Sequence, residues 1–191
     1  MKFIVPCAAA LVAVLAAQPV FAQDAQPFSG FHADIEGGWS RDGGHRIPSD
    51  GFVYGGRAGY DVALANVRIG PELEVTGSTQ KYCEKITRNG AAVDSCQRTD
   101  RDLYAGGRIG YVFSPSVMAY AKVGYTNGRF GDRISGGNDD WHSRNRNGVR
   151  AGGGLEYAIS PRFYVSAEYR YSHYNRDTHQ SQLMSGVGVR F

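Results

Sequence analysis

The residues of this chain with the greatest chemical potential are charged side chains that recur at alternate positions of extended segments. Glu168 lies in sequence between Ser166 and Ser172, a combination that could serve acyl transfer if a base and an orienting group were in reach. No histidine is expected beside either serine, because His173 adjoins Ser172 only in sequence. We therefore predict no catalytic residues. The alternating charges are Asp34, Glu36, Arg57, Asp61, Arg68, Glu72, Glu74, Asp102, Arg108, Lys122, Arg150, Glu156, Glu168, Arg170 and Arg190.

Metal and cofactor chemistry has little support in the sequence. Four histidines are expected in loops on one side of the molecule, but their spacing matches no common metal motif. Residues 136–140 resemble an acidic calcium loop only faintly and lack its repeat. We expect neither a metal nor a cofactor. The four histidines are His45, His142, His173 and His179.

Residues 1–22 are typical of a cleaved secretory signal peptide. Lys2 supplies the charged start, residues 3–17 are apolar, and residues 20–22 form a small-residue cleavage motif. We expect cleavage between Ala22 and Gln23, followed by an N-terminal extension over residues 23–30 and one domain over residues 31–191.

Two cysteines, Cys83 and Cys96, remain after removal of the leader with Cys7. An even number of cysteines in an exported chain favours a disulfide. Asn89-Gly90 lies between them and is a strong signal for a tight hairpin turn. A hairpin would place the two cysteines opposite each other, so we predict a Cys83–Cys96 bridge in an outer loop.

Period-two alternation of apolar and polar residues predicts eight β-strands of 9–11 residues, the length of a tilted membrane strand. The connections between them alternate between long and short, which predicts an antiparallel barrel with its long loops on one rim. Long connections cover residues 41–51, 77–101 and 127–146, with a medium one at 173–180. Short ones cover 63–65, 113–116 and 158–162. The strands are residues 31–40, 53–62, 66–76, 102–112, 117–126, 147–157, 163–172 and 181–191.

Composition excludes several other classes of protein. A mean hydropathy of −0.37 and the lack of a long apolar run beyond the leader exclude a helical membrane protein. A hydrophobic content of 42% argues against disorder, and a net charge of +3 without a basic block argues against nucleic-acid binding. The apolar face is thin in mid-strand and aromatic at strand ends, which favours a membrane barrel over a soluble one.

In a membrane barrel the charged face must point inward. An eight-stranded lumen is only wide enough for side chains to fill. The near balance of acids and bases predicts a salt-bridged plug, with a narrow ion pathway as the alternative.

The chain resembles the small eight-stranded outer-membrane β-barrels, which include OmpA-like and OmpX-like membrane domains and opacity-type surface proteins. The resemblance covers roughly residues 31–191. It rests on the run Gly-Pro-Glu-Leu-Glu at 70–74, on Gly-rich strands that end in Tyr, and on the final Phe191. It implies an all-β, eight-stranded, antiparallel, up-and-down transmembrane barrel in the outer membrane. It also implies that Phe191 is part of the signal read by the barrel-assembly machinery.

The favoured function is that of a non-enzymatic surface protein whose long loops serve structural, adhesive, or host- and envelope-binding roles. A narrow, low-conductance pore and a lipid-modifying enzyme are the alternatives. Expected partners are outer-membrane lipid, lipopolysaccharide, the assembly machinery, and host or envelope surface ligands. We expect no nucleic-acid partner and a monomeric protein.

Overall fold

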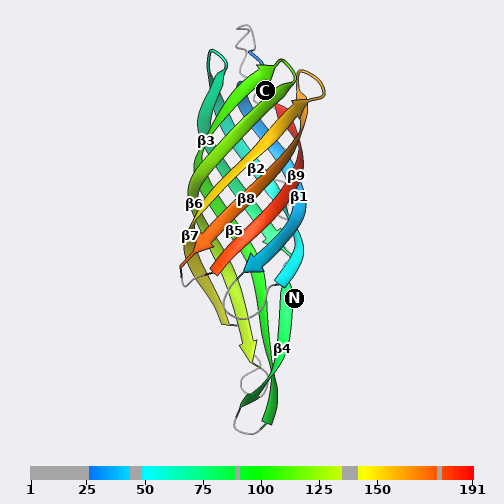
Figure 1. The fold of residues 1–191 in the computed structure, drawn as a ribbon, viewed down its shortest axis with the longest axis vertical. Coiled ribbons are helices and arrows are strands. Elements are labelled where there is room, and N and C mark those ends of the chain that lie inside the picture. Colours follow the sequence, from blue (N-terminus) through cyan, green and yellow to red (C-terminus); the bar gives the residue numbers. More distant parts are fainter. Residues whose placement is uncertain (1–25, 44–48, 89–90, 135–141, 176–177) are drawn as a thin grey trace, which may run out of the picture.

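The computed structural model describes residues 26–43, 49–88, 91–134, 142–175 and 178–191, and its regular elements are β-strands (Figure 1). Across these ranges, no helix has the length and apolarity needed to cross a membrane. The strands are β1 (Gly30–Gly43), β2 (Ser49–Leu64), β3 (Val67–Ser78), β4 (Lys81–Arg88), β5 (Ala91–Ser114), β6 (Val117–Ile134), β7 (His142–Ala158), β8 (Phe163–Tyr174) and β9 (Thr178–Arg190).

Eight of these strands form a closed antiparallel ring. Each ring strand pairs with the next ring strand along the chain, with β3 pairing to β5 past β4, and the pairing of β1 with β9 completes the ring. β4 lies outside the ring and pairs with the first part of β5. The expected eight-stranded antiparallel barrel is therefore confirmed, with a hairpin added above one rim.

The two rims of the barrel differ. Short connections join β2 to β3, β5 to β6 and β7 to β8 at the rim that carries Phe191, uppermost in Figure 1. The long connections lie at the other rim, where the β4–β5 hairpin projects. We call these the short-turn rim and the long-loop rim.

Several strands are longer than the hydrophobic alternation predicts. β5 has 24 residues and β6 has 18, and both continue far into segments expected to be loops. Alternation marks a strand only while one face is apolar, so it ends where the apolar wall ends. The hydrogen-bonded ladder does not need an apolar face and continues beyond it.

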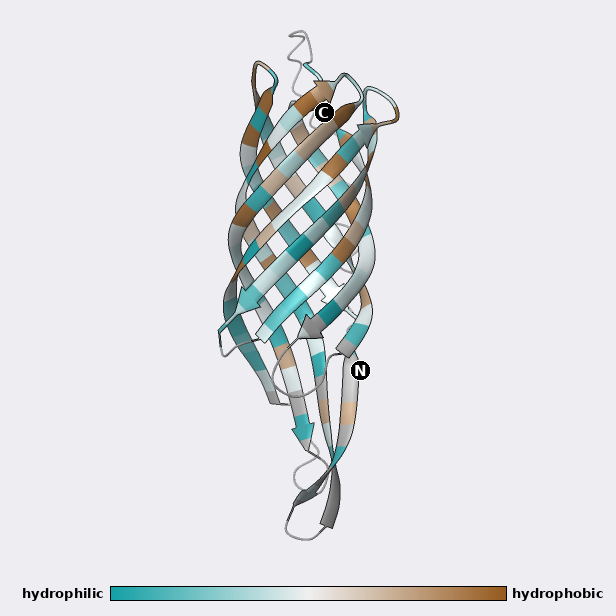
Figure 2. Cartoon of the chain, viewed as in Figure 1, coloured by the Kyte–Doolittle hydropathy of each residue, from teal (hydrophilic) through white to brown (hydrophobic). Residues whose placement is uncertain are grey.

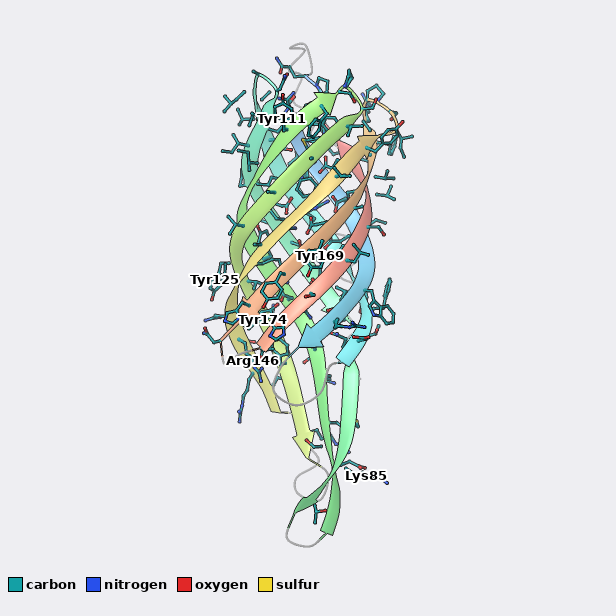
Figure 3. All side chains as sticks on the ribbon, viewed as in Figure 1. Lys85, Tyr111, Tyr125, Arg146, Tyr169 and Tyr174 are labelled. Carbon is teal, nitrogen blue, oxygen red and sulfur yellow. A yellow bond between two sulfur atoms is a disulfide. The ribbon has the colours of Figure 1, made fainter. Side chains whose placement is uncertain are left out.

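The large hydrophobic side chains on the strands are mostly exposed on the outer wall and the alternating charged ones are buried in the lumen, the reverse of a soluble barrel. Figure 2 shows how hydrophobic and hydrophilic residues alternate along the strands. Small residues such as Ala121 and Ala151 occupy the middle of the outer wall. Tyr111 lies near the short-turn rim, and Tyr125 and Tyr169 lie toward the other end (Figure 3). Exposed aromatics are Phe31, Tyr60, Phe113, Tyr157, Phe163 and Phe191 on the strand ends of the first rim, and Trp39, Phe52, Tyr54 and Tyr171 on those of the second.

Inward-facing glycines make room for aromatic rings in the lumen. A Cβ at Gly188 would collide with the ring of Tyr164, and one at Gly124 would collide with Tyr104. Both tyrosines are buried. Some of the glycines in these strands are thus required by the close approach of a lumen side chain.

Candidate functional site

The lumen contains all fifteen of the charged side chains that alternation assigns to one face. Each is buried, with at most 8% of its surface exposed. The eight acids are contributed by six of the ring strands, and the seven bases by seven of them. Burying charge at this density is tolerable only when each ion is paired and hydrogen-bonded. The contacts described next meet that condition for most of them.

Four charges form a cluster near the short-turn rim, and Arg108 links it to Glu72 at 3.4 Å. The guanidinium of Arg108 donates to Asp61 through Nε at 2.9 Å and also through Nη2, and to Oε1 of Glu156 at 2.7 Å. Arg190 donates to the same two carboxylates, at 2.9 Å to Asp61 and 2.7 Å to Glu156. His32 is buried beside them, with its Nδ1 3.4 Å from Asp61.

Arg57 organises the next layer of the lumen. It donates to Oδ2 of Asp34 through Nε at 2.9 Å and through Nη2 at 2.7 Å, and to Oε2 of Glu168 at 2.6 Å. The hydroxyl of Tyr120 accepts from Arg57 at 2.9 Å and donates to Glu168 at 2.7 Å. Tyr164 donates to Asp34 at 2.8 Å. The two tyrosine hydroxyls thus add hydrogen bonds to the ions of this layer beyond those that Arg57 makes with the carboxylates.

Glu74 is the centre of the layer nearer the long-loop rim. It lies 2.9 Å from Lys122, 2.6 Å from Arg150 and 2.6 Å from Arg170. Lys122 also reaches Glu72 at 3.0 Å. One carboxylate therefore contacts three cations from three different strands.

The lumen is closed at the long-loop rim by a polar layer. Tyr174 donates to Asp102, and Thr126 donates to the same carboxylate at 2.5 Å. Arg170 donates through Nε to Gln182 at 2.6 Å. A cavity of about 10 Å³ lies at this level, lined by residues that include Thr76, Asp102 and Gln182. That volume has room for about one water molecule.

Arg68 departs from the predicted pairing. It is buried, but its hydrogen bonds go to backbone carbonyls of Pro27, Ala65 and Val67 at 2.7–2.9 Å. No ion pair of Arg68 with a described carboxylate is present within 4.0 Å. Its position beside the β2–β3 turn explains this, since the turn leaves carbonyls without ladder partners.

Aromatic side chains complete the lumen, and sequence reasoning gave them no role there. Tyr104, Tyr120, Tyr164 and Tyr174 are buried among the charges. The guanidinium groups of Arg57 and Arg108 lie 5.6 and 5.2 Å from the ring centre of Tyr120. Each of these tyrosines shares the alternation parity of the charged positions on its strand, a signal that was available in the sequence.

The two serines considered for catalysis lie in the lumen next to cations. Ser166 accepts from Arg57 at 3.2 Å, and Ser172 accepts from Nε of Arg150 at 2.8 Å. Neither serine has a described hydrogen bond to a histidine or a carboxylate. A hydroxyl that accepts from a guanidinium is not activated as a nucleophile.

Two of the histidines expected in loops, His173 and His179, lie instead in strands, because β8 and β9 continue beyond the predicted alternation. His173 on β8 and His179 on β9 are register partners, and the His179 ring stacks against Tyr171 at 6.1 Å. His45 lies outside the described residues, and His142 is the first residue of β7. The described part of the chain contains no group of three or more potential metal ligands.

The β4–β5 hairpin extends the barrel beyond the long-loop rim (Figure 1). Cys83 and Cys96 are register partners and form a disulfide, with their Cα atoms 4.0 Å apart. The predicted bridge and hairpin are thus present. The expected turn at Asn89-Gly90 lies outside the described residues.

A closed barrel with an apolar outer wall and a charged lumen has close counterparts among known proteins. The family described as outer membrane protein beta-barrel domain matches residues 7–191. The chain belongs to this family. The outer-membrane barrel is located in the bacterial outer membrane.

Two relatives of this outer-membrane barrel are described as outer-membrane immunogenic proteins. A 31 kDa outer-membrane immunogenic protein of Brucella melitensis biotype 1 is 28% identical over 154 residues, covering 76% of this chain and 62% of that protein. A 25 kDa outer-membrane immunogenic protein of Brucella ovis is 32% identical over 84 residues, covering 44% of this chain and 40% of that protein. The chain spans less than two-thirds of the length of these curated relatives.

Two solved structures have the same fold as this outer-membrane barrel. Neisserial surface protein A has a TM-score of 0.61 and 20% identity, over 85% of this chain and 98% of that one. The attachment invasion locus protein Ail of Yersinia pestis has a TM-score of 0.57 and 20% identity, over 85% of this chain and 99% of that one. At this level of identity, the likeness extends to the fold alone.

Proposed function

We propose that the protein is a non-enzymatic surface protein that contacts ligands outside the cell through its long-loop rim. The main contact element is the β4–β5 hairpin. The ligand would then be contacted by loops and by the hairpin rather than by the wall of the barrel. Binding residues commonly lie on loops that a rigid scaffold positions.

The projecting hairpin is the observation that carries this proposal. β4 and the first part of β5 lie beyond the residues through which β3 and β5 close the ring, so this hairpin adds nothing to the closure of the barrel. The Cys83–Cys96 bridge nevertheless fixes their register. Lys85 and Thr87 are exposed on the hairpin, and Lys85 extends away from it (Figure 3). A braced element with exposed polar side chains is suited to contacting a partner.

The filled lumen argues against the pore alternative. The layers around Asp61, Arg57 and Glu74 cross the interior at successive heights, and each is closed by direct hydrogen bonds. An ion would have to break several buried pairs to pass, and each break leaves an uncompensated charge. The enzyme alternative lacks support for a different reason, because Ser166 and Ser172 are bonded to guanidinium groups.

The names of similar proteins are compatible with a surface role. The Brucella relatives are described as immunogenic, and one structure of Ail is described as a complex with the heparin analogue sucrose octasulfate. We extend a contact role to this chain on the basis of its own hairpin, with heparin as a practical probe.

The proposal is tested by shortening the hairpin in the full chain. Residues 81–98 are replaced by an Asn-Gly turn, and the variant is displayed on bacteria beside the unaltered protein. We expect attachment to heparin-coated surfaces and to cultured epithelial cells to fall to the level of bacteria without the protein. The different migration of unboiled and boiled samples, the mark of a closed barrel, should persist.

Arg162→Ala provides the control, since Arg162 is exposed at the short-turn rim and faces away from the cell surface. It should attach like the unaltered protein. Two results would count against the proposal. One is equal attachment by the hairpin-shortened variant, and the other is no attachment by the unaltered protein to either surface.

A further inference from the structure

Two arginines lie side by side on the outer wall near the long-loop rim. Arg101 on β5 and Arg129 on β6 are register partners, and both side chains are exposed. Their neighbours in the same row are Gly77 on β3 and Asn145 on β7, neither of which carries a charge. The two cations therefore face outward next to each other, and like charges directly opposite on adjacent strands are destabilising.

No acid among the described residues neutralises this pair. Of the two acids adjacent to Arg101 in sequence, Asp102 is buried in the lumen, and Asp100 falls at a shift in the β5–β6 register and lies 2.7 Å from Nε of Arg98. Outside the lumen, Asp50 is bonded to Arg41 on the other side of the barrel, at 3.1 Å. Neither Arg101 nor Arg129 has a described ion-pair partner. The structure thus leaves two adjacent guanidinium groups available to an external anion.

The height of the pair on the wall identifies what surrounds it. Arg129 lies four residues beyond Tyr125 on β6, and Asn127 lies between them on the same face. Four residues of a strand tilted by about 40° rise about 10 Å toward the outside. Asn127 donates to Asn147 on β7 at 2.6 Å, which marks the change from apolar to polar wall. The arginines are therefore level with lipid headgroups.

The chemistry of the pair favours a phosphate group. A guanidinium binds two oxygens of a phosphate at once. Two guanidinium groups carry two positive charges, which match the two negative charges of a phosphate monoester. Phosphatidylethanolamine offers only a singly charged phosphodiester, and its ammonium would be repelled by the pair. The outer leaflet at this rim presents lipopolysaccharide, whose lipid A moiety carries phosphate monoesters.

We propose that Arg101 and Arg129 form a binding site for a phosphate group of lipid A on the outer wall of the barrel. This site is separate from the hairpin contact proposed above, because it lies on the wall and faces lipid. Bound lipopolysaccharide would offset the repulsion between the two arginines and fix its own position on the β5–β6 face.

The test uses the full chain folded in nanodiscs of phosphatidylethanolamine, with EDTA present so that no divalent cation bridges anions. Bisphosphorylated lipid A is titrated in, and bound lipid is counted by native mass spectrometry. We expect the double variant Arg101→Gln, Arg129→Gln to bind lipid A at least tenfold more weakly than the unaltered protein. Dephosphorylated lipid A should bind to both proteins equally weakly.

Arg162→Gln is the matched control, because it removes an exposed arginine at the opposite rim. It should bind lipid A like the unaltered protein, and all three proteins should retain the migration shift of a folded barrel. Equal affinity of the double variant for lipid A would overturn the proposal. So would a loss of heparin binding with lipid A binding unchanged, which would assign the pair to sulfated glycans.

Discussion

Nη1 of Arg150 on β7 donates a hydrogen bond to Oε1 of Glu74 on β3 at 2.6 Å. β3 and β7 are three positions apart in the ring of eight, so this bond crosses the lumen and joins strands that share no ladder. The cross-section of the barrel is thus held by side chains within it as well as by the ladder around it.

Glu74→Gln should be strongly destabilising. The change keeps the shape of the side chain but removes the charge that Lys122, Arg150 and Arg170 share. Removing one partner of a buried ion pair costs about 3–5 kcal/mol, because the remaining charges are buried without compensation. Urea-induced unfolding in lipid vesicles, followed by tryptophan fluorescence, measures the change in the free energy of unfolding.

Thr87→Ala serves as the control for that measurement, since Thr87 is exposed on the hairpin. It should change the free energy of unfolding by less than about 0.5 kcal/mol. A Glu74→Gln barrel as stable as the Thr87→Ala barrel would mean that the lumen network does not hold the walls together.

Ala151→Arg should destabilise the barrel by a different mechanism. Ala151 is exposed on the outer wall of β7, where a charge would lie in lipid near the bilayer midplane. Such a charge costs about 2–4 kcal/mol in a membrane barrel. Asn175→Arg, just beyond the end of β8, places the same side chain outside the wall and should cost less than about 1 kcal/mol. Similar unfolding free energies for the two variants would contradict the assignment of the outer face.

The ring of strands and the direction of their faces follow from sequence because they depend on local alternation. Ala121 and Lys122, for example, are adjacent residues of one strand, so the alternation alone predicts that they point to opposite faces. The partners of Lys122 do not follow in this way. Glu74 and Glu168 reach it from strands far apart in sequence, and the pairing depends on the relative shift of strands around the ring.

Two further features could not be predicted from the alternation of residues along single strands. Arg68 has the parity of a lumen charge, but it donates to the carbonyls of Ala65 and Val67 beside it in sequence and to the carbonyl of Pro27, which only the folded chain brings near. The adjacency of Arg101 and Arg129 depends on the irregular register of β5 against β6 near Thr99. Such shifts in register have no clear signature in a strand where both faces are polar.

Reduction of the disulfide should loosen the hairpin and leave the barrel intact. Cys83 and Cys96 are 13 residues apart, and a cross-link over a loop of that size contributes about 3 kcal/mol by chain entropy. We expect two alkylatable thiols only after reduction, detected by mass spectrometry, and faster cleavage by trypsin at Lys85. The migration shift of the unboiled protein should not change. Free thiols in the exported, unreduced protein would contradict this prediction.

Removal of Phe191 should lower the amount of assembled barrel in cells, because we propose that this residue belongs to the signal read by the assembly machinery. Its ring lies 6.0 Å from that of Phe31, and its backbone N–H donates to the Phe31 carbonyl at 2.9 Å. Phe113→Ala removes another exposed aromatic at the same rim and controls for lost lipid contact. The two variants are compared by the amount of heat-modifiable protein in isolated outer membranes. Equal losses in the two variants would argue against a specific role for Phe191.

Single-channel recording in planar lipid bilayers tests most directly whether the charged lumen is a closed plug. The layers centred on Asp61, Arg57 and Glu74 leave room for about one water molecule at the cavity near Asp102. We expect the refolded, heat-modifiable protein to insert without discrete conductance steps. We expect such steps from the Glu74→Gln variant, because it removes the carboxylate at the centre of one layer. Regular steps from the unaltered protein would contradict a closed lumen and favour the pore.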